Sequence, residues 1–137
     1  MGIPDLADSK LTELTEFVAE DIELDPWPAF ADDDILGGDP AHRGKVLYRD
    51  PTKRLSFGIW ECPVGVFREV YDPFGEMIHC IQGEAIVTNE HTGVAVHLTP
   101  GSRMIAPVGL TAIWDVKETF KKVYAGFEES WDESRYY

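Results

Sequence analysis

The sequence has few cysteines, few positive charges and no long apolar run. Its 137 residues include two cysteines, Cys62 and Cys80, which are too few for a disulfide scaffold and lie outside CxxC spacing. Lys and Arg number 12 against 25 Asp and Glu, a formal net charge of −13 that argues against nucleic acid as a partner. No stretch approaches 18 consecutive apolar residues, so no membrane span is expected. Buried, reduced thiols and a well-solvated surface follow from this composition.

The N-terminus also lacks a basic region followed by an apolar run, so the sequence predicts no secretory signal peptide. A cytoplasmic location is therefore expected. The length fits a single domain, and 44% hydrophobic residues are enough to build a core without disulfide bonds or structural metal ions.

The first 43 residues are predicted to form a helix and an extended arm. Apolar residues recur at spacings of three and four over residues 9–24, which predicts one helix with Ser9 as its N-cap. Pro26 and Pro28 end any helix there. Residues 25–43 are rich in proline, glycine and aspartate, and we expect an ordered arm anchored on the core by Trp27 and Phe30.

Residues 44–127 change to short apolar segments separated by turn residues. Glycine or proline stands in most of the gaps, as at Gly83 and at the pair Pro100-Gly101. The predicted strands are Lys45–Arg49, Leu55–Cys62, Gly65–Tyr71, Glu76–Gln82, Glu84–Asn89, Val94–Leu98, Arg103–Ala106, Ala112–Val116 and Phe120–Phe127. Many short strands at roughly ten-residue spacing predict a β-sandwich or a closed barrel, and the barrel's mouth can hold one small ligand. Residues 128–137 form an acidic, aromatic tail that we expect to pack on the barrel or on a neighbouring subunit.

Two segments resemble the conserved motifs of the cupin superfamily. Glu76, six residues and Gly83 match the E-x6-G half of the first motif. Gly101, five residues, then Pro107 and Gly109 match the first half of the second motif. The resemblance implies an all-β fold, a single cupin jelly-roll barrel (a double-stranded β-helix), here preceded by a helix and an arm.

The finer pattern is similar to one branch of that superfamily. The segments Ile59–Phe67, Tyr71–Gly83 and Ile113–Val116 look like the cupin domains of ureidoglycine aminohydrolases and of the ethanolamine-utilisation cupin. The resemblance covers about residues 38 to 127. It implies a homodimer, which an amphipathic helix and an aromatic tail on a small barrel also favour.

The positions of the metal-binding histidines in the cupin motifs are occupied by other residues. Counting back from Glu76, the two histidine positions fall on Val70 and Asp72 or on Glu69 and Tyr71, and the second-motif histidine position is Ala112. A divalent ion such as Mn, Fe, Ni or Zn would have Glu76 as its certain ligand and Asp72 as a substitute. The alternatives are an acid–base pair of these two carboxylates, or a turn aspartate and a glutamate paired with a nearby lysine or arginine.

Further candidates flank the motif. Tyr71 joins Glu76 and Asp72 as a candidate catalytic residue, because its phenol can donate or accept a hydrogen bond. Trp60, Trp114 and Cys80 are candidate ligand-binding residues, and ordinary core packing is the alternative for each of them.

The alternation of strand residues places other charged groups by their faces. His79 and His97 are expected to face outward and His91 to lie in a solvated turn, whereas an arm folded over the mouth could deliver His42. Lys121 and Lys122 lie on opposite faces of their strand, so one of them can point inward; Arg68 and Arg103 are further candidates to balance the carboxylates.

Three functions remain open. The first is a small-molecule enzyme resembling ureidoglycine aminohydrolase, with Glu76 in an acid–base role, with or without a metal. The second is a metal-free cupin that binds a small metabolite without catalysis, and the third is a structural or accessory dimer. Bound metal would favour the first, whereas a collapsed mouth with Glu76 neutralised by lysine or arginine would favour the third.

Overall fold

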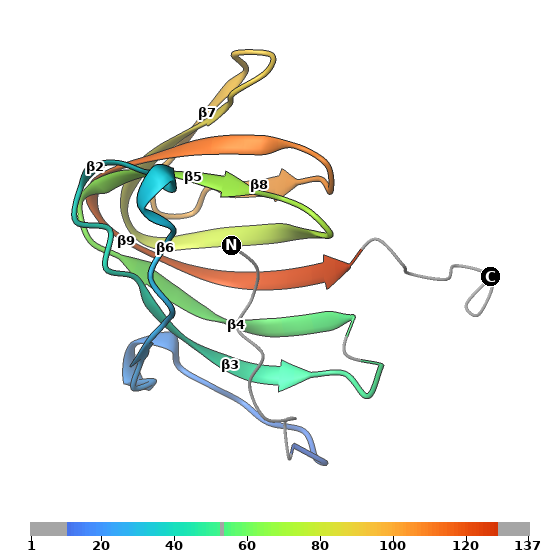
Figure 1. The fold of residues 1–137 in the computed structure, drawn as a ribbon. Coiled ribbons are helices and arrows are strands. Elements are labelled where there is room, and N and C mark those ends of the chain that lie inside the picture. The colour runs from blue at the N-terminus through green and yellow to red at the C-terminus, as the bar shows by residue number, and fades with distance from the viewer. Residues whose placement is uncertain (1–10, 53, 129–137) are drawn as a thin grey trace.

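The chain folds into a curled β-sheet with almost no helix (Figure 1). The structure is a computed structural model that describes residues 11–52 and 54–128. The described strands are β1 (Asp25–Pro26), β2 (Ile35–Gly38), β3 (Arg43–Arg49), β4 (Leu55–Cys62), β5 (Gly65–Val70), β6 (Phe74–Asn89), β7 (Ala95–Leu98), β8 (Arg103–Ala106) and β9 (Thr111–Glu128). Two single-turn 3-10 helices are η1 (Ala19–Asp21) and η2 (Asp32–Asp34). The predicted all-β barrel is confirmed.

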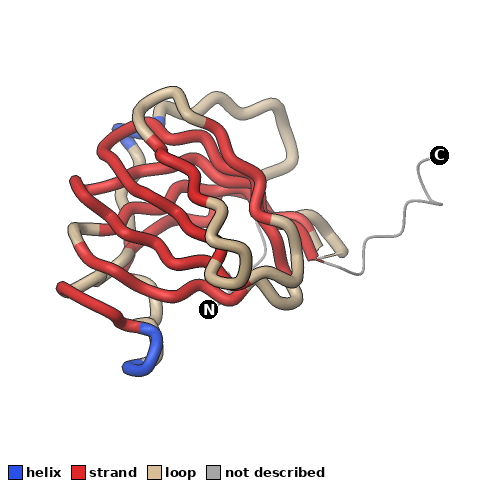
Figure 2. Tube along the Cα trace, turned by 90° about the horizontal axis from the view of Figure 1, so that it is seen from above, coloured by secondary structure: helices blue, strands red, loops and turns tan. Residues whose placement is uncertain are grey.

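Strand β9 organises the sheet because it pairs along both of its edges. Its first part, Thr111–Val116, pairs with β5, and its later part, Phe120–Phe127, pairs with β4. Its other edge pairs with β6 over nearly the full length of both strands. All of these pairs are antiparallel, and the sheet curls around an interior that Figure 2 shows from above.

The strand boundaries follow the turn residues closely. Leu55–Cys62 and Arg103–Ala106 are observed as predicted. Two pairs of predicted strands are instead fused: β6 continues through Gly83, and β9 continues from Val116 to Phe120. The β6–β9 register shifts at this place, and the backbone of Gly83 has a φ of 84°. The predicted break is therefore a bend at which both long strands turn together.

The arm crosses the sheet in short pieces that pair with different strands. β1 pairs with β3, and β2 pairs with β5. The segment between β1 and β2, residues 27–34, contains η2 and carries Phe30 into the core. The predicted extended arm, anchored by Trp27 and Phe30, is confirmed, because Phe30 is buried and Trp27 packs against the core.

The predicted helix over residues 9–24 is wrong. Residues 11–18 have no regular secondary structure, and only the 3-10 turn Ala19–Asp21 follows; residues 9 and 10 lie outside the described part. The apolar face of this segment is not buried, since Leu14 is 95% exposed. Glutamates at 13, 16 and 20 would stack at spacings of three and four, where like charges destabilise a helix. None of the described residues forms a helix long and apolar enough to cross a membrane.

The bend at Gly83 gives the first prediction. A Cβ at Gly83 would collide with the carbonyl oxygen of Thr119 on β9, and the positive φ disfavours any L side chain. Gly83→Ala should therefore destabilise the protein by about 2–4 kcal/mol, measured by urea unfolding. Gly93→Ala is the matched control, because Gly93 has a similar φ of 78° but open space around it. Equal losses in the two variants would contradict the collision.

Candidate functional site

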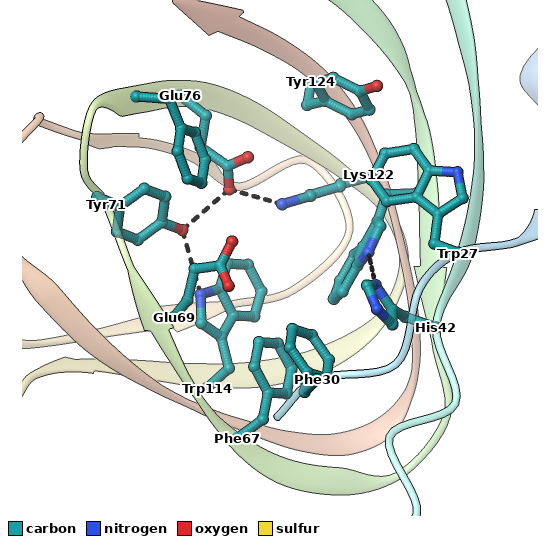
Figure 3. A pocket seen from close by; sticks show the side chains of 12 residues that line it. Trp27, Phe30, His42, Phe67, Glu69, Tyr71, Glu76, Trp114, Lys122 and Tyr124 are labelled. Atoms are coloured by element: carbon teal, nitrogen blue, oxygen red, sulfur yellow. Dashed lines mark hydrogen bonds and ion pairs between the residues drawn. The ribbon is translucent and has the colours of Figure 1, made fainter. Parts of the chain in front are cut away.

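A cavity of about 30 Å³ lies inside the barrel, and its walls are mainly aromatic (Figure 3). Strands β4, β5, β6 and β9 supply most of the wall, and the arm closes one side of it. The lining residues are Trp27, Phe30, His42, Trp60, Phe67, Glu69, Tyr71, Phe74, Glu76, Trp114, Lys122 and Tyr124. Most of them are buried, so the charged groups among them sit in a largely apolar interior.

Strand alternation explains why these side chains meet. Trp114, Lys122 and Tyr124 occupy even positions of β9, and all three are buried. The cross-strand partner of Trp114 is Phe67 on β5, and that of Lys122 is Trp60 on β4. The Lys122 ammonium therefore lies between Trp60 of the neighbouring strand and Trp114 of its own strand. The face of β9 that points inward is thus continuous across the bend.

A chain of hydrogen bonds runs through the site. The indole N–H of Trp114 donates to Tyr71 Oη over 3.2 Å, and that phenol donates to Glu76 Oε1 over 3.0 Å. Lys122 Nζ donates to the same Oε1 over 2.6 Å. Burial, together with the nearby Glu76 charge, raises the pKa of Tyr71 well above its usual value. Tyr71 therefore stays protonated at neutral pH and serves as a hydrogen-bond donor.

The ammonium of Lys122 is also held by two aromatic faces. Its Nζ lies 4.5 Å from the ring centre of Trp60 and 4.7 Å from that of Trp114. A cation–π contact contributes about 2 kcal/mol when it is shielded from water. The side chains of Lys122 and Glu76 are each 7% exposed, so the pair forms a buried ion pair. Such a pair specifies geometry more than it adds stability, because both charges have lost their hydration.

A second carboxyl group, Glu69, faces the same cavity from β5 (Figure 3). Burial and the neighbouring charge of Glu76 raise its pKa to about 7. From the sequence, Glu69 was identified only as a residue at one of the possible histidine positions of the first motif. Phe67, Glu69 and Tyr71 share one parity on the predicted strand Gly65–Tyr71, and that shared parity was the signal available for placing Glu69 in the site.

The arm completes the wall with Trp27, Phe30 and His42. The Phe30 ring stacks on His42 with 4.1 Å between centres and on Phe67 with 4.2 Å. His42 Nδ1 accepts the indole N–H of Trp60 over 2.8 Å, and its Nε2 lies 2.8 Å from the carbonyl oxygen of Pro28. Burial lowers the pKa of His42, and the charge of Lys122 lowers it further. The arm does deliver His42 to the mouth, as one of the sequence alternatives allowed.

The structure brings four of the six predicted site residues together. Glu76, Tyr71, Trp60 and Trp114 all line the cavity. Asp72 is an exposed turn residue that does not line it. Cys80 is buried but lies outside the lining, and its Sγ is 3.5 Å from the carbonyl oxygen of Gln82.

The remaining ionisable residues of the sequence prediction lie outside the cavity lining, and Lys121 among them is buried. Arg103 donates to His79 Nδ1, His97 pairs with Glu84, and Arg68 forms a two-bonded contact with Glu90. His91 is exposed in its turn. Both cysteines are free and buried, as expected, and burial raises the pKa of Cys62 to about 12.

The side chains present do not fit a bound metal ion. Within residues 11–52 and 54–128, no three His, Cys, Asp or Glu side chains are grouped so that they could hold one. The expected ligand Glu76 already accepts a hydrogen bond from the ammonium of Lys122 over 2.6 Å, so its Oε1 is not available to a metal ion. His42, the single histidine of the cavity lining, has both ring nitrogens engaged by Trp60 and Pro28.

Comparison with known proteins assigns the family. The family model described as the EutQ-like cupin domain matches residues 49–124. The chain belongs to this family. No curated protein matches this EutQ-like cupin in sequence.

Solved structures agree in fold. The EutQ protein of Clostridium difficile superposes with a TM-score of 0.56 at 19% identity, covering 67% of this chain and 66% of that one. A Pseudomonas syringae protein of the DUF861 family gives a TM-score of 0.70 at 18% identity, covering 78% of this chain and 45% of that one. The Schizosaccharomyces pombe Cnp3 cupin domain gives 0.63 at 14% identity, with 88% and 78% covered. This chain thus spans just under two thirds of the EutQ chain and less than half of the Pseudomonas one.

The buried ion pair gives the second prediction. Lys122→Met removes the counter-ion and leaves Glu76 charged in an apolar interior, so a loss of about 3–5 kcal/mol in the free energy of unfolding is expected. The double variant Lys122→Met with Glu76→Gln should recover most of that loss, because no unpaired charge remains. Urea unfolding at neutral pH measures both.

Lys117→Met is the control for this cycle, since Lys117 forms an exposed pair with Asp115 on the same strand. Its change should stay within about 1 kcal/mol. A double variant as unstable as the single Lys122→Met variant would show that the lysine stem, not its charge, carries the stability.

Proposed function

We propose that this EutQ-like cupin binds a small cationic amine inside the barrel without a metal ion. The observation that carries the proposal is the Lys122–Glu76 ion pair, which is buried among tryptophans in the lining of the barrel cavity. The indole faces of Trp60 and Trp114 already hold one ammonium group there. They show the kind of charge that this interior stabilises.

The charges lining the cavity favour a cation over an anion. Among the described lining residues, two carboxyl groups (Glu69 and Glu76) stand against one ammonium, and the buried His42 is neutral. Glu76 Oε1 accepts from both Tyr71 and Lys122, while none of the described residues donates to Oε2. An ammonium ligand supplies a donor for that oxygen. A carboxylate ligand would add a third negative charge.

The cavity sets a limit on ligand size. At about 30 Å³ it has room for one or two water molecules, so a ligand must be compact or the arm must move. This narrow mouth and the neutralised Glu76 are also features that an accessory role predicts. We favour ligand binding because a barrel that served only as scaffold would be as stable or more stable with apolar residues in place of the ion pair.

An acid–base enzyme is the second candidate, and Glu69 is the observation that favours it. A carboxyl group with a pKa of about 7 can both accept and donate a proton at neutral pH. The motif resemblance to ureidoglycine aminohydrolase domains supports the same class, with Glu76 and Tyr71 holding the substrate. Because the donor set does not fit a metal, no metal-bound step is assigned.

We also propose that two copies pair through the outer face of the sheet. The cross-strand neighbours Met77 and Ile105 are 51% and 66% exposed, and Phe57 is exposed on the same sheet. An apolar cavity of about 590 Å³ lies between this face and residues 11–22. Contiguous exposed apolar surface of this kind is typical of protein–protein contacts.

Ligand class gives the third prediction. Isothermal titration calorimetry with propylammonium, 1-propanol and propionate, which are similar in size, should show binding of propylammonium alone. Affinity should rise up to about tenfold from about pH 6 to about pH 8, because Glu69 loses its proton through this range and its charge then attracts the cation. Glu69→Gln should flatten the pH dependence, whereas Glu84→Gln, on the outer face, should leave it unchanged.

Other outcomes separate the proposals. Preferential binding of propionate would keep a ligand-binding barrel but reject the amine class. No binding of any probe would reject the ligand role and favour an accessory dimer. Elemental analysis of the purified protein should find no stoichiometric Mn, Fe, Ni or Zn, and a stoichiometric metal would contradict metal independence.

The outer face gives the fourth prediction. Met77→Lys with Ile105→Lys should convert a dimer to a monomer in sedimentation velocity, because two charges would be buried in the contact. Val64→Lys is the control, since Val64 is 56% exposed in the turn between β4 and β5. A wild-type protein that sediments as a monomer at high concentration would refute the pairing.

A further inference from the structure

We propose that residues 27–34 form a lid over the barrel cavity and that His42 is the latch that releases it in acid. This inference rests on the proposed function only for what the lid covers, namely the ligand cavity. The lid segment lies between β1 and β2, the short strands that attach the arm to β3 and β5. His42 lies at the base, one residue before β3, and so belongs to the barrel side of the contact.

The hydrogen bonds of His42 fix it in one neutral form. An indole N–H can only donate, so the Trp60 contact requires a lone pair on His42 Nδ1. The carbonyl oxygen of Pro28 can only accept, so the 2.8 Å contact requires the proton on Nε2. Both partners are therefore satisfied by the neutral Nε2–H tautomer and by no other state of the ring.

The same ring carries the packing of the lid. Phe30 is sandwiched between His42 and Phe67, and Trp27 meets His42 edge-on with 6.0 Å between ring centres. The Pro28 carbonyl thus contacts the barrel through His42, and the Phe30 ring contacts it through both His42 and Phe67. At its far end the lid is tied by Arg68, which donates to the Asp33 carbonyl and lies 3.8 Å from Asp34.

Protonation of His42 breaks this arrangement. A proton on Nδ1 would point at the Trp60 N–H, so two donors would face each other. The new charge would also lie near the ammonium of Lys122 on β9, which already disfavours it. Glu69 on β5 has a pKa of about 7, so it becomes protonated as the pH falls. Glu76 on β6 already forms an ion pair with Lys122. The cavity therefore offers the imidazolium no free counter-charge among its described residues.

The direction of the pH effect follows from linkage. In the closed state burial holds the pKa of His42 below its ordinary value, whereas in the open state the ring is hydrated and binds a proton more readily. Closure is therefore fully favoured above about pH 6.5 and weakens as the pH falls below that value. Acid opens the cavity, and neutral pH closes it.

Hydrogen exchange of the ligand-free protein, read by mass spectrometry, tests the lid at about pH 5 and about pH 7.5 after correction for intrinsic rates. Peptides covering residues 27–34 should lose protection several-fold at the lower pH, while β6 and β9 keep theirs. The indole N–H resonance of Trp60 should shift over the same range. His42→Gln, which can still accept from Trp60, should show neither change, and His91→Gln, in an exposed turn, should behave as wild type.

The hydrogen-exchange results test the latch independently of the proposed ligand binding. Unchanged protection of residues 27–34 in acid, or the same loss in His42→Gln, would overturn the latch and leave the amine proposal standing. If His42→Gln fails to fold, the ring nitrogen resonances of His42 in the wild-type protein provide the test. A His42 ring that stays neutral while the lid opens would also overturn the latch. Opening in acid with no amine bound at any pH would uphold the latch and reject the proposed function.

Discussion

The double pairing of β9 is the constraint on which the rest of the molecule depends. One continuous strand pairs with β5, β4 and β6, so its inward parity carries Trp114, Lys122 and Tyr124 into a single cavity. At the bend beside Gly83, β9 keeps buried side chains at even positions, whereas the buried positions of β6 change from even to odd through the shift in register. β9 thus supplies both ends of the hydrogen-bond chain, Trp114 and Lys122, and Tyr71 and Glu76 join them.

The motif glutamate has a different counter-charge from the one that its position suggests. Glu76 stands where the cupin resemblance places a metal ligand, yet its balancing cation is Lys122, a part of the chain itself. An ammonium needs no imidazole donors, and the tryptophan faces replace part of its lost hydration. The inward Lys122 thus supplies the positive charge beside Glu76 that a metal ion held by the motif histidines would otherwise supply.

The sequence predicted the barrel because turn residues mark strand ends independently of distant contacts, as at Pro100-Gly101. It predicted Glu76 from the motif, and Tyr71, Trp60 and Trp114 from the strands that flank the motif, and all four line the cavity. It failed for the helix over 9–24, where apolar periodicity was present but no surface covers Leu14. It could not select Lys122 over Lys121, nor exclude Asp72 from the site, because both outcomes depend on which strands meet across the barrel.

The family match and the cavity have different boundaries. The EutQ-like cupin domain accounts for residues 49–124, whereas Trp27, Phe30 and His42 lie before it and still form one wall of the cavity. One wall of the cavity can therefore differ between two proteins that share the matched domain. A barrel transplanted without residues 27–42 would lack this wall.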